Sequence, residues 1–568
     1  MVEVFYQFYR KFLKQELIGL LILLVLTGCT PAHYQTRADR EAYGVLFEKT
    51  PRVENVEPES VVLAPPIALD LARLPLFTGG GDFMGPFASS ERGASQLSLD
   101  DALFTGVTLG RDYLFEKEGV FLSALDLTLA RYRLAPVAFA GALGRRATDS
   151  RDAVLQAQMT ELVSTNTFAR TQTAGFNWLL QTGARISTDF TQDFLRIMTG
   201  NQSFNQSDLA VSIVQPLLQG AGATVTLEAL TQEERNLLYD LRDFADFRRA
   251  YIVGIATDYY NVLRARDQAR NNFLNYQGFL KNVGREEAFA EEDRRTQSEL
   301  GQLRQASLVA QRRWLDSVQS YLSRLDSFKI SIGLPVSEKI VLDSGTLRKL
   351  RIEAPEVTQE QAVEIALVTR PDLATAADLV EDATRRIGVA ENGLLPGLDL
   401  SLDYDVASDP GDTTPALNAD RRRWRSSLDV DLPLDRKAER NRYRASQIIG
   451  ERAARAEELS RDRATLQIYE AWRAIEQARR NFDIAEVSLA LAERRLEEQL
   501  LLADLGKGRA RDLVDAQEDL VDAQNRRTST LIDHTLARLR LWRDMGILYI
   551  EGDGKWAVRL SKEPPQGE

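Results

Sequence analysis

The stretch LSLDDALFTGVTLGRDYLFEKEGVFLSALDLTLARYRLAP occupies residues 97–136, and VTQEQAVEIALVTRPDLATAADLVEDATRRIGVAENGLLP occupies residues 357–396. At this constant offset of 260 they align without a gap and share six identical residues, namely Ala102 and Ala362, Asp112 and Asp372, Val120 and Val380, Ala130 and Ala390, Leu134 and Leu394, and Pro136 and Pro396. The same patterns follow each stretch in the same order: alternation typical of a β-strand, a proline-containing exit and two long helices. We therefore predict one structural unit present twice, at 97–335 and 357–550, in a quasi-symmetric, barrel-like body. The alternative is two coiled-coil segments that resemble each other only in composition.

Charge and composition exclude one class of partner. The chain of 568 residues has a formal net charge of −12, and 27% of its residues are charged. Proteins that bind DNA or RNA concentrate lysine and arginine to replace the counterions of the phosphates. We therefore predict no nucleic-acid partner for this acidic chain.

The N-terminus has the pattern of an export signal. Basic residues precede an apolar core at Leu17–Leu26, and Leu26-Thr27-Gly28-Cys29 closes it. This closing sequence resembles the lipobox of bacterial lipoproteins, which implies a signal peptide at 1–28 and a lipid on Cys29, the only cysteine in the chain. Thr30 follows where an inner-membrane retention signal usually has Asp, so the resemblance implies the outer membrane. The alternative is an ordinary signal peptide or a membrane anchor that happens to contain a cysteine, although the apolar core is too short to span a bilayer comfortably.

A tether is expected at 29–96, after the lipidated cysteine. Its charged stretch Arg37–Lys49 favours a short helix, and the proline-rich stretch that follows disfavours both helix and central strand. We expect it to run extended along the surface of the body.

Each copy of the repeat opens with short amphipathic helices. The first are predicted at Leu97–Leu109 and Val357–Thr369, and a second helix in each copy should end just before Pro136 or Pro396.

Alternation with a period of two marks strands in the second copy. Leucines alternate with acidic or serine residues over Leu398–Tyr404, and a second alternating run covers Trp424–Leu432. One apolar and one acidic face are what a strand needs between lipid and water. The two runs predict a membrane hairpin, although a half-buried sheet in a soluble protein gives the same alternation.

The first copy contains an insert at about 145–185. Its two equivalent prolines, Pro136 and Pro216, lie 80 residues apart, against 37 in the second copy, so 43 residues are additional. We predict a helix near Ala153–Phe168, an alternating run at Leu180–Phe190 and a return strand at Leu209–Leu217, without deciding which stretches cross a membrane.

Heptad repeats predict two very long helices, at about Leu227–Arg285 and Arg436–Leu502. Some sixty residues correspond to roughly 90 to 100 Å at 1.5 Å per residue, a length typical of a rod, a coiled coil or a tube. Apolar residues recur every seventh position at Leu230, Leu237, Phe244 and Tyr251, and at Ile468, Ile475, Phe482, Leu489 and Leu496.

Glycine turns are predicted where each long helix meets its return helix. They comprise Leu300, Gly301, Gln302 and Leu303 in the first copy, and Leu505, Gly506, Lys507 and Gly508 in the second. The two return helices share Ala310-Gln311 with Ala516-Gln517, and they should end near Gly333 and Gly546.

Over residues 97–550 these features together resemble the TolC-like outer membrane efflux proteins. The motifs that carry the resemblance are Gln215-Pro216-Leu217-Leu218, Thr369-Arg370-Pro371-Asp372-Leu373, Leu394-Leu395-Pro396 and the glycine-turn helix returns, and the lipobox places the chain near the lipoprotein branch. The resemblance implies a mainly α-helical chain with a pair of membrane β-hairpins, in which a homotrimer builds one β-barrel from four strands per chain and a long periplasmic α-helical barrel. A two-stranded hairpin cannot satisfy its edges in lipid, which independently requires closure by oligomerisation.

The resemblance also implies a function. The chain would be a lipid-anchored outer membrane duct extending into the periplasm, and the exit channel of a tripartite efflux or type I secretion system. An inner-membrane pump would supply the energy, and a periplasmic adaptor protein would contact the helix turns. We expect a short C-terminal tail at 551–568.

Two carboxylates are candidates for the periplasmic entrance. Asp512 and Asp515 follow the second glycine turn, and a spacing of three residues places both on one helix face. The family resemblance implies that acidic residues at this spacing line the entrance, where six carboxylates in a trimer would favour cations. The chain departs from the family pattern at Ser307 and Ala310, interpreted as the equivalent positions, and lacks the Tyr and Arg of the entrance latch. A solvated helix face is the alternative.

No catalytic, metal or cofactor site is predicted. His33 and His534 are the only histidines, and neither has the spacing of a metal ligand set. No glycine-rich phosphate loop follows a strand. The remaining alternative is a periplasm-spanning coiled-coil scaffold or adaptor without a channel. Adaptors usually carry one helical hairpin between compact β-domains, whereas this chain has two hairpins.

Overall fold

A computed structural model describes residues 30–63, 71–79, 82–154, 160–197, 202–291, 296–355, 357–409, 416–505 and 507–559. The predicted signal peptide, Cys29 and Gly506 lie outside the described residues. The chain divides into two units, of which one comprises Met1–Leu46, Leu122–Leu238 and Ala376–Ala456, and the other Phe47–Phe121, Tyr239–Thr375 and Glu457–Glu568.

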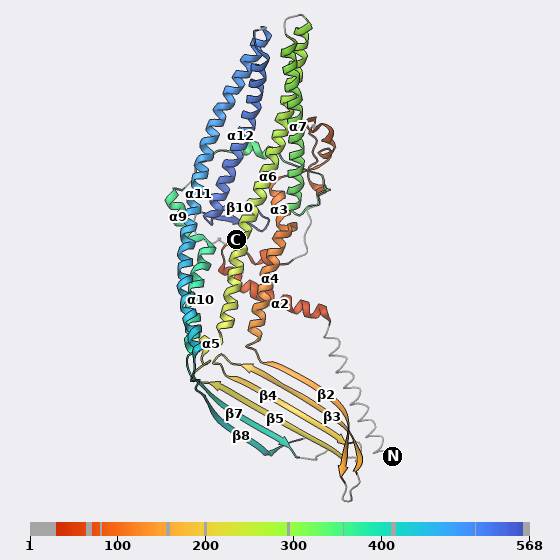
Figure 1. The fold of residues 1–568 in the computed structure, drawn as a ribbon, viewed down its shortest axis with the longest axis vertical. Helices are drawn as coiled ribbons and strands as arrows, with labels where there is room; N and C mark the ends of the chain where they lie inside the picture. Colours follow the sequence, from red (N-terminus) through yellow and green to blue (C-terminus); the bar gives the residue numbers. More distant parts are fainter. Residues whose placement is uncertain are drawn as a thin grey trace. The chain divides into compact units, whose positions relative to one another are not determined.

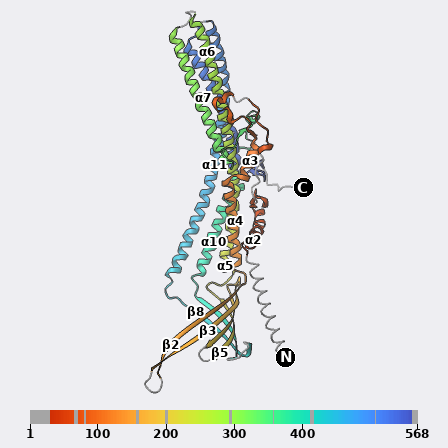
Figure 2. The ribbon, with the colours of Figure 1, turned by 90° about the vertical axis from the view of Figure 1, so that its right-hand side faces the viewer.

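The first unit contains a six-stranded antiparallel sheet in the order β2-β3-β4-β5-β7-β8 (Figures 1 and 2). Every strand pairs with its neighbour along the chain, including β5 with β7 across the helices that separate them in sequence. The strands are β2 (Val137–Val154), β3 (Thr160–Leu179), β4 (Arg185–Ile197), β5 (Gln202–Pro216), β7 (Gly397–Ser408) and β8 (Leu417–Asp431).

The first repeat therefore contributes four strands where two were predicted. The helix predicted near Ala153–Phe168 is wrong, because its described residues belong to β2 and β3. These two strands pair without interruption from Val137 opposite Asn177 to Val154 opposite Thr160. The backbone N–H and C=O groups of β2 and β3 form hydrogen bonds with each other. The periodicity of a single segment cannot predict that a partner strand lies beside it. The prediction of four strands per chain is corrected to six.

The short helices of the two repeats have matching bounds. Helices α3 (Leu99–Leu109) and α9 (Gln359–Thr369) differ by 260 at both ends, and so do α4 (Arg111–Tyr132) and α10 (Pro371–Asn392). Both α3 and α9 begin with a capping box, in which Ser98 or Thr358 accepts a hydrogen bond from the N3 backbone N–H and the N3 side chain returns one. The predictions of these four helices are confirmed.

Two long helices follow the strands, as predicted. Helix α6 (Glu228–Glu291) has 64 residues, and α11 (Lys437–Asp504) has 68. The heptad positions Leu237, Phe244 and Ile468 are buried at no more than 1% exposure, so the seven-residue repeat marks packed helix faces. No helix in the described part of the chain is both long and apolar enough to span a membrane.

The glycine turn predicted at Gly301 is wrong. Helix α7 (Gln297–Ser331) starts four residues earlier, and Thr296 caps it by accepting a hydrogen bond from the backbone N–H of Glu299. Leu300, Gly301, Gln302 and Leu303 consequently lie in its first two turns. A helix-interior glycine costs about 1 kcal/mol, which the cap and packing of the helix offset.

Correcting that start also changes the match between the return helices. Helix α7 and α12 (Ala510–Asp544) each have 35 residues and differ by 213 in position. Ala310-Gln311 therefore corresponds to Ala523-Gln524 rather than Ala516-Gln517. The positions equivalent to Asp512 and Asp515 are Glu299 and Gln302, and the predicted equivalents Ser307 and Ala310 are buried.

Both return helices end at a glycine that only a residue without a side chain can occupy. Gly333 has φ +83°, and an added Cβ would lie 2.1 Å from the carbonyl oxygen of Leu109 at the end of α3. Gly546 has φ +75°, and its Cβ would lie 3.3 Å from the carbonyl oxygen of Thr369 at the end of α9. In each case the left-handed backbone and the close helix end require glycine.

The N-terminal segment is more ordered than an extended tether. Helix α2 (Pro31–Lys49) confirms the predicted short helix, and four 3₁₀ turns follow: η1 (Thr50–Arg52), η2 (Pro58–Val61), η3 (Leu71–Arg73) and η4 (Asp82–Ser90). Met84 in η4 is fully buried in the apolar core of the second unit, among residues of α3, α6, α7 and α12. The surface position predicted for this segment is therefore wrong at η4.

Short elements complete the second unit. Strand β1 (Ser95–Leu97) pairs in parallel with β6 (Ile340–Leu342), and β9 (Leu548–Ile550) pairs antiparallel with β10 (Trp556–Val558). The remaining short helices are α5 (Ala223–Thr226), in the first unit, and α8 (Gly345–Lys349). Buried Arg248 on α6 donates hydrogen bonds to the backbone oxygens of Asn55 and Ile550, so it joins the N-terminal segment to β9.

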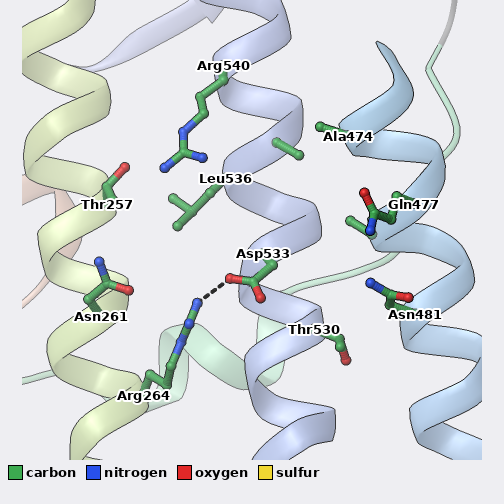
Figure 3. A pocket seen from close by; sticks show the side chains of 12 residues that line it. Thr257, Asn261, Arg264, Ala474, Gln477, Asn481, Thr530, Asp533, Leu536 and Arg540 are labelled. Carbon is green, nitrogen blue, oxygen red and sulfur yellow. Dashed lines mark hydrogen bonds and ion pairs between the residues drawn. The ribbon is translucent and has the colours of Figure 1, made fainter. Parts of the chain in front are cut away.

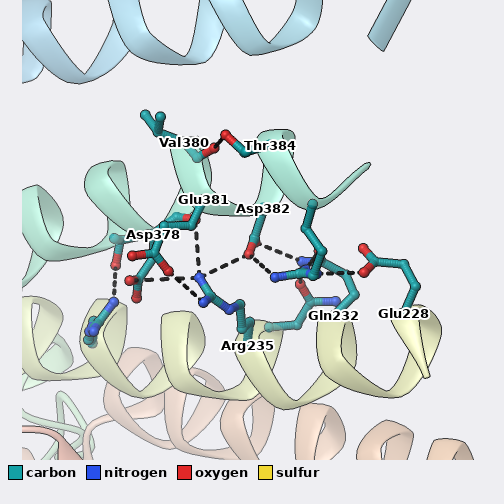
Figure 4. Close-up of polar contacts among 12 residues, drawn as sticks. Glu228, Gln232, Arg235, Asp378, Val380, Glu381, Asp382 and Thr384 are labelled. Atoms are coloured by element: carbon teal, nitrogen blue, oxygen red, sulfur yellow. Dashed lines mark hydrogen bonds and ion pairs between the residues drawn. The ribbon is translucent and has the colours of Figure 1, made fainter. Parts of the chain in front are cut away.

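An ion-pair network joins the two repeats within the first unit (Figure 4). Asp382 on α10 is 1% exposed and lies 3.0 Å from both Arg235 on α6 and Arg385 on its own helix. Arg235 also contacts Glu381 at 2.7 Å, and Arg385 contacts Glu228 at 2.5 Å. Charges that are paired this closely hold α10 at one position along α6.

Candidate functional site

The six-stranded sheet has one apolar face. Directly opposite residues on neighbouring strands point to the same side, so the register assigns each side chain to a face. We call one side the apolar face; its members on β3, β4, β5, β7 and β8 include Phe176, Trp178, Ile186, Phe190, Leu209, Ile213, Leu398, Leu400, Leu402, Tyr404, Trp424, Leu428 and Val430. Many of these are large and exposed, with Trp424 at 74% and Leu428 at 59%. A continuous exposed apolar surface of this kind is typical of contact with lipid or a protein partner.

The opposite side, which we call the polar face, carries charges of both signs. Asp403 and Asp405 on β7 stand directly opposite Arg425 and Arg423 on β8. Asp403 also accepts a hydrogen bond of 2.7 Å from the hydroxyl of Ser212 on β5. The acidic face predicted from the sequence is therefore corrected to a face of mixed charge, because Arg423 and Arg425 alternate along β8 with the apolar residues. The face is suited to line a water-filled space that holds both cations and anions.

The predicted entrance carboxylates lie in the first two turns of α12. Asp512 and Asp515 are both exposed, on the same side of the helix. The guanidinium of Arg511 lies 4.0 Å from the Asp515 carboxylate. Acidic residues near a helix N-terminus are stabilised by the helix dipole.

The turn between α11 and α12 agrees with the predicted glycine turn at its described residues. The backbone N–H groups of Lys507 and Gly508 both donate to the carbonyl oxygen of Leu502, at 2.9 and 3.0 Å, which ends α11. Leu505 is exposed at 67% beside this turn. In the first repeat the corresponding connection falls between Glu291 and Thr296, so the candidate docking residues there are displaced from the predicted ones.

A polar cavity of about 290 Å³ opens among α6, α11 and α12 in the second unit (Figure 3). Arg264 reaches from α6 to Asp533 on α12 at 2.5 Å, and Asn261, Gln477 and Arg540 also line the cavity. Binding pockets for small molecules are predominantly apolar. The polar, ion-paired lining of this cavity differs from that of such a pocket.

His534 occupies the interior of α12 and does not form part of a metal site. Its side chain is fully buried, and burial lowers its pKa, so the imidazole is neutral near pH 7. Within the described residues, no group of three or more His, Cys, Asp or Glu side chains is arranged to hold a metal ion. His33, the other histidine, stacks edge-on with Tyr34 in α2, at 6.0 Å between ring centroids.

Comparison of the whole fold with solved structures identifies a single class of protein. The Campylobacter jejuni CmeC outer membrane channel superposes with a TM-score of 0.58 at 14% identity, over 79% of this chain and 85% of CmeC. The transmembrane channel CusC gives 0.57 at 14%, over 85% and 97% of the two chains. The Neisseria gonorrhoeae MtrE outer membrane channel gives 0.56 at 13%, over 79% and 88%. No protein-family model matches the sequence, and no curated protein matches it significantly.

The chain has the outer membrane channel fold. The resemblance to TolC-like channels that the sequence motifs indicated is confirmed at the level of the fold. These structural neighbours are channels rather than enzymes.

Proposed function

We propose that the chain is one subunit of a homotrimeric outer membrane channel, the passive exit duct of a tripartite efflux or type I secretion system. The observation that carries the proposal is the six-stranded sheet, which has an exposed apolar face, a charged polar face and unpaired outer edges at β2 and β8 among the described strands. In lipid every backbone group needs a partner, so such a sheet is stable only as part of a closed barrel.

The helices supply the second part of the proposal. Helices α6, α7, α11 and α12 form the wall of a periplasmic duct, and the hydrated cavity beside Arg264 faces its interior. The matching bounds of α3 and α9, and of α4 and α10, support an origin by duplication of one unit. A coiled-coil scaffold or adaptor without a channel would leave the broad apolar face of the sheet exposed to water. This face therefore disfavours that alternative.

An inner-membrane pump and a periplasmic adaptor are the proposed partners. The structural neighbours are channels, and in this proposal the pump supplies the energy for transport. The adaptor contacts the helix turns near Leu505, Lys507 and Gly508 in the second repeat. In the first repeat it contacts the start of α7, where Gly301 and Gln302 are exposed, whereas the predicted contacts Leu300 and Leu303 are buried.

A lipid on Cys29 is proposed to anchor the subunit in the outer membrane. The sequence Leu26-Thr27-Gly28-Cys29 motivates this proposal, and no other cysteine can accept the lipid. Cys29→Ser is expected to abolish labelling by a fatty-acid analogue, measured by fluorescence of the gel band. Equal labelling of wild type and variant would remove the lipid anchor but leave the channel proposal in place.

The channel and its entrance are tested together by electrical recording. The purified trimer in a planar bilayer is expected to conduct ions and to favour cations, because three copies of Asp512 and Asp515 place six carboxylates around the entrance. Asp512→Asn should reduce the cation preference more than Asp515→Asn, since Arg511 already screens Asp515. The measurement is the reversal potential under a salt gradient.

Two outcomes of that recording have different meanings. A trimer that does not conduct would overturn the proposed channel. A conducting trimer whose reversal potential is the same in the wild type and in Asp512→Asn with Asp515→Asn would show that these carboxylates only solvate the helix. Glu299→Gln, at the equivalent position of α7, is the matched control. The Glu299 carboxylate accepts hydrogen bonds from the backbone N–H and the hydroxyl of Thr296 at the start of the helix.

A further inference from the structure

The outer edges of the sheet are formed by β2 and β8. With six antiparallel strands in an up-and-down order, β2 and β8 run in opposite directions. The β8 edge of one copy can therefore meet the β2 edge of another in an antiparallel pair, the arrangement of every other pair in the sheet. A chain with an odd number of strands would present parallel edges instead.

The two edges also match face to face. On the apolar face, β8 carries Trp424, Ser426 and Leu428. Each of them pairs with a β7 residue of that same face. The apolar face of β2 carries Ala138, Ala140 and Ala142. This assignment follows because Ala138 pairs with Phe176, a β3 residue of the apolar face. Large side chains on one edge would thus lie beside alanines on the other. This combination packs without collision when two copies are joined.

We propose that β8 of each subunit pairs with β2 of the next, so that three copies close a barrel of 18 strands, six from each chain. Each outer edge of the sheet therefore pairs with a second copy of this chain. This inference rests on the proposed trimeric channel and adds the identity of the joining strands and the width of the barrel. The hairpin of β2 and β3 is thereby part of the barrel wall rather than an appendage.

The additional hairpin sets the width of the outer membrane pore. Barrel diameter increases roughly linearly with strand number, so 18 strands make a barrel about 1.5 times as wide as 12, the number from four strands per chain. Barrels of this strand number leave an open aqueous channel. The β-barrel would then admit bulkier solutes than a four-strand chain allows, and selection by size would fall to the helical part of the duct.

Cysteine crosslinking identifies the strand that joins the next subunit. In a Cys29→Ser background, which has no other thiol, Ser426→Cys on β8 is combined in turn with Ala138→Cys, Ala140→Cys or Ala142→Cys on β2. The three positions scan the register between copies. The membrane-embedded protein is oxidised, and covalent species are separated on a denaturing gel without reductant.

A second series tests the narrower barrel, in which β4 would be the joining strand. It combines Ser426→Cys with Ile186→Cys, Thr188→Cys or Phe190→Cys, which have the same spacing and lie on the same face of β4. Within one chain, β8 is three strand spacings from β4 and five from β2. These correspond to roughly 14 and 24 Å at about 4.8 Å per spacing, too far for an internal disulfide.

The expected result is a covalent trimer from at least one pair of the β2 series and from none of the β4 series. Phe139→Cys with Ser426→Cys is the matched control that should remain uncrosslinked, because Phe139 points to the polar face. A covalent trimer from the β4 series would overturn the 18-strand barrel and retain a trimeric channel. A native trimer that conducts but crosslinks in neither series would also overturn it. A monomer that does not conduct would overturn the proposed channel itself.

Discussion

Leu400→Arg is expected to remove most of the folded trimer from the outer membrane. Leu400 lies in β7 on the apolar face, between Gln215 of β5 and Leu428 of β8. An arginine on the lipid side of a barrel costs up to about 2 to 4 kcal/mol, and less as its position approaches the membrane surface. The cost arises once in every subunit, so it is incurred three times in a trimer. The amount of heat-resistant trimer in the outer membrane fraction, compared on a gel before and after heating, measures the effect.

Ser401→Arg is the matched control for this experiment. Ser401 is the next residue of β7, and it points to the polar face opposite Val214 and Ser427. Because an arginine there remains in water, the variant should yield trimer at close to the wild-type level. Equal losses in Leu400→Arg and Ser401→Arg would contradict the assignment of the two faces.

Glu91→Ala is expected to lower the unfolding free energy of the second unit by about 3 to 5 kcal/mol. Glu91 is 1% exposed and accepts two hydrogen bonds from Arg266, at 2.8 and 2.9 Å. The phenol of Tyr321, whose pKa burial raises well above its ordinary value, donates a third at 2.8 Å. Removing the carboxylate leaves the Arg266 guanidinium desolvated between the rings of Phe77 and Phe83 without a counter-charge.

The shift in the urea midpoint, followed by tryptophan fluorescence, measures this loss. Glu59→Ala is the control, because Glu59 is an exposed glutamate of the same N-terminal segment and should leave the midpoint almost unchanged. Combining Glu91→Gln with Arg266→Met should cost less than the sum of the single variants, since neither charge is then left alone. Equal midpoints for Glu91→Ala and Glu59→Ala would contradict a stabilising role for this cluster.

The sequence alone was sufficient for features that depend on nearby residues. The bounds of α3 and α9 follow from capping boxes at Ser98 and Thr358, and the long helices follow from their heptads, because both signals act within a few turns. The strands β7 and β8 follow from alternation, which already separates the residues of the apolar face from those of the polar face. For the site, Asp512 and Asp515 were placed correctly on one exposed helix face.

Two errors concern local signals that compete with each other. Gly301 was interpreted as a turn, although Thr296 and Glu299 form a capping box that marks the helix start, and this pattern was present in the sequence. The arginines of β8 were likewise visible, and the alternation that assigns Trp424 to the apolar face assigns Arg423 and Arg425 to the other. Both errors could have been avoided without a structure.

The tertiary structure alone decided what depends on distant partners. Strand β2 lacks the alternation of β7, because alanines and glycines occupy much of it, and its identity as a strand comes from its register with β3. Likewise, 175 residues separate Glu91 from Arg266, so no periodicity can predict their ion pair. Local patterns determined the helices and one hairpin of this protein, whereas long-range backbone pairing decided that its sheet has six strands.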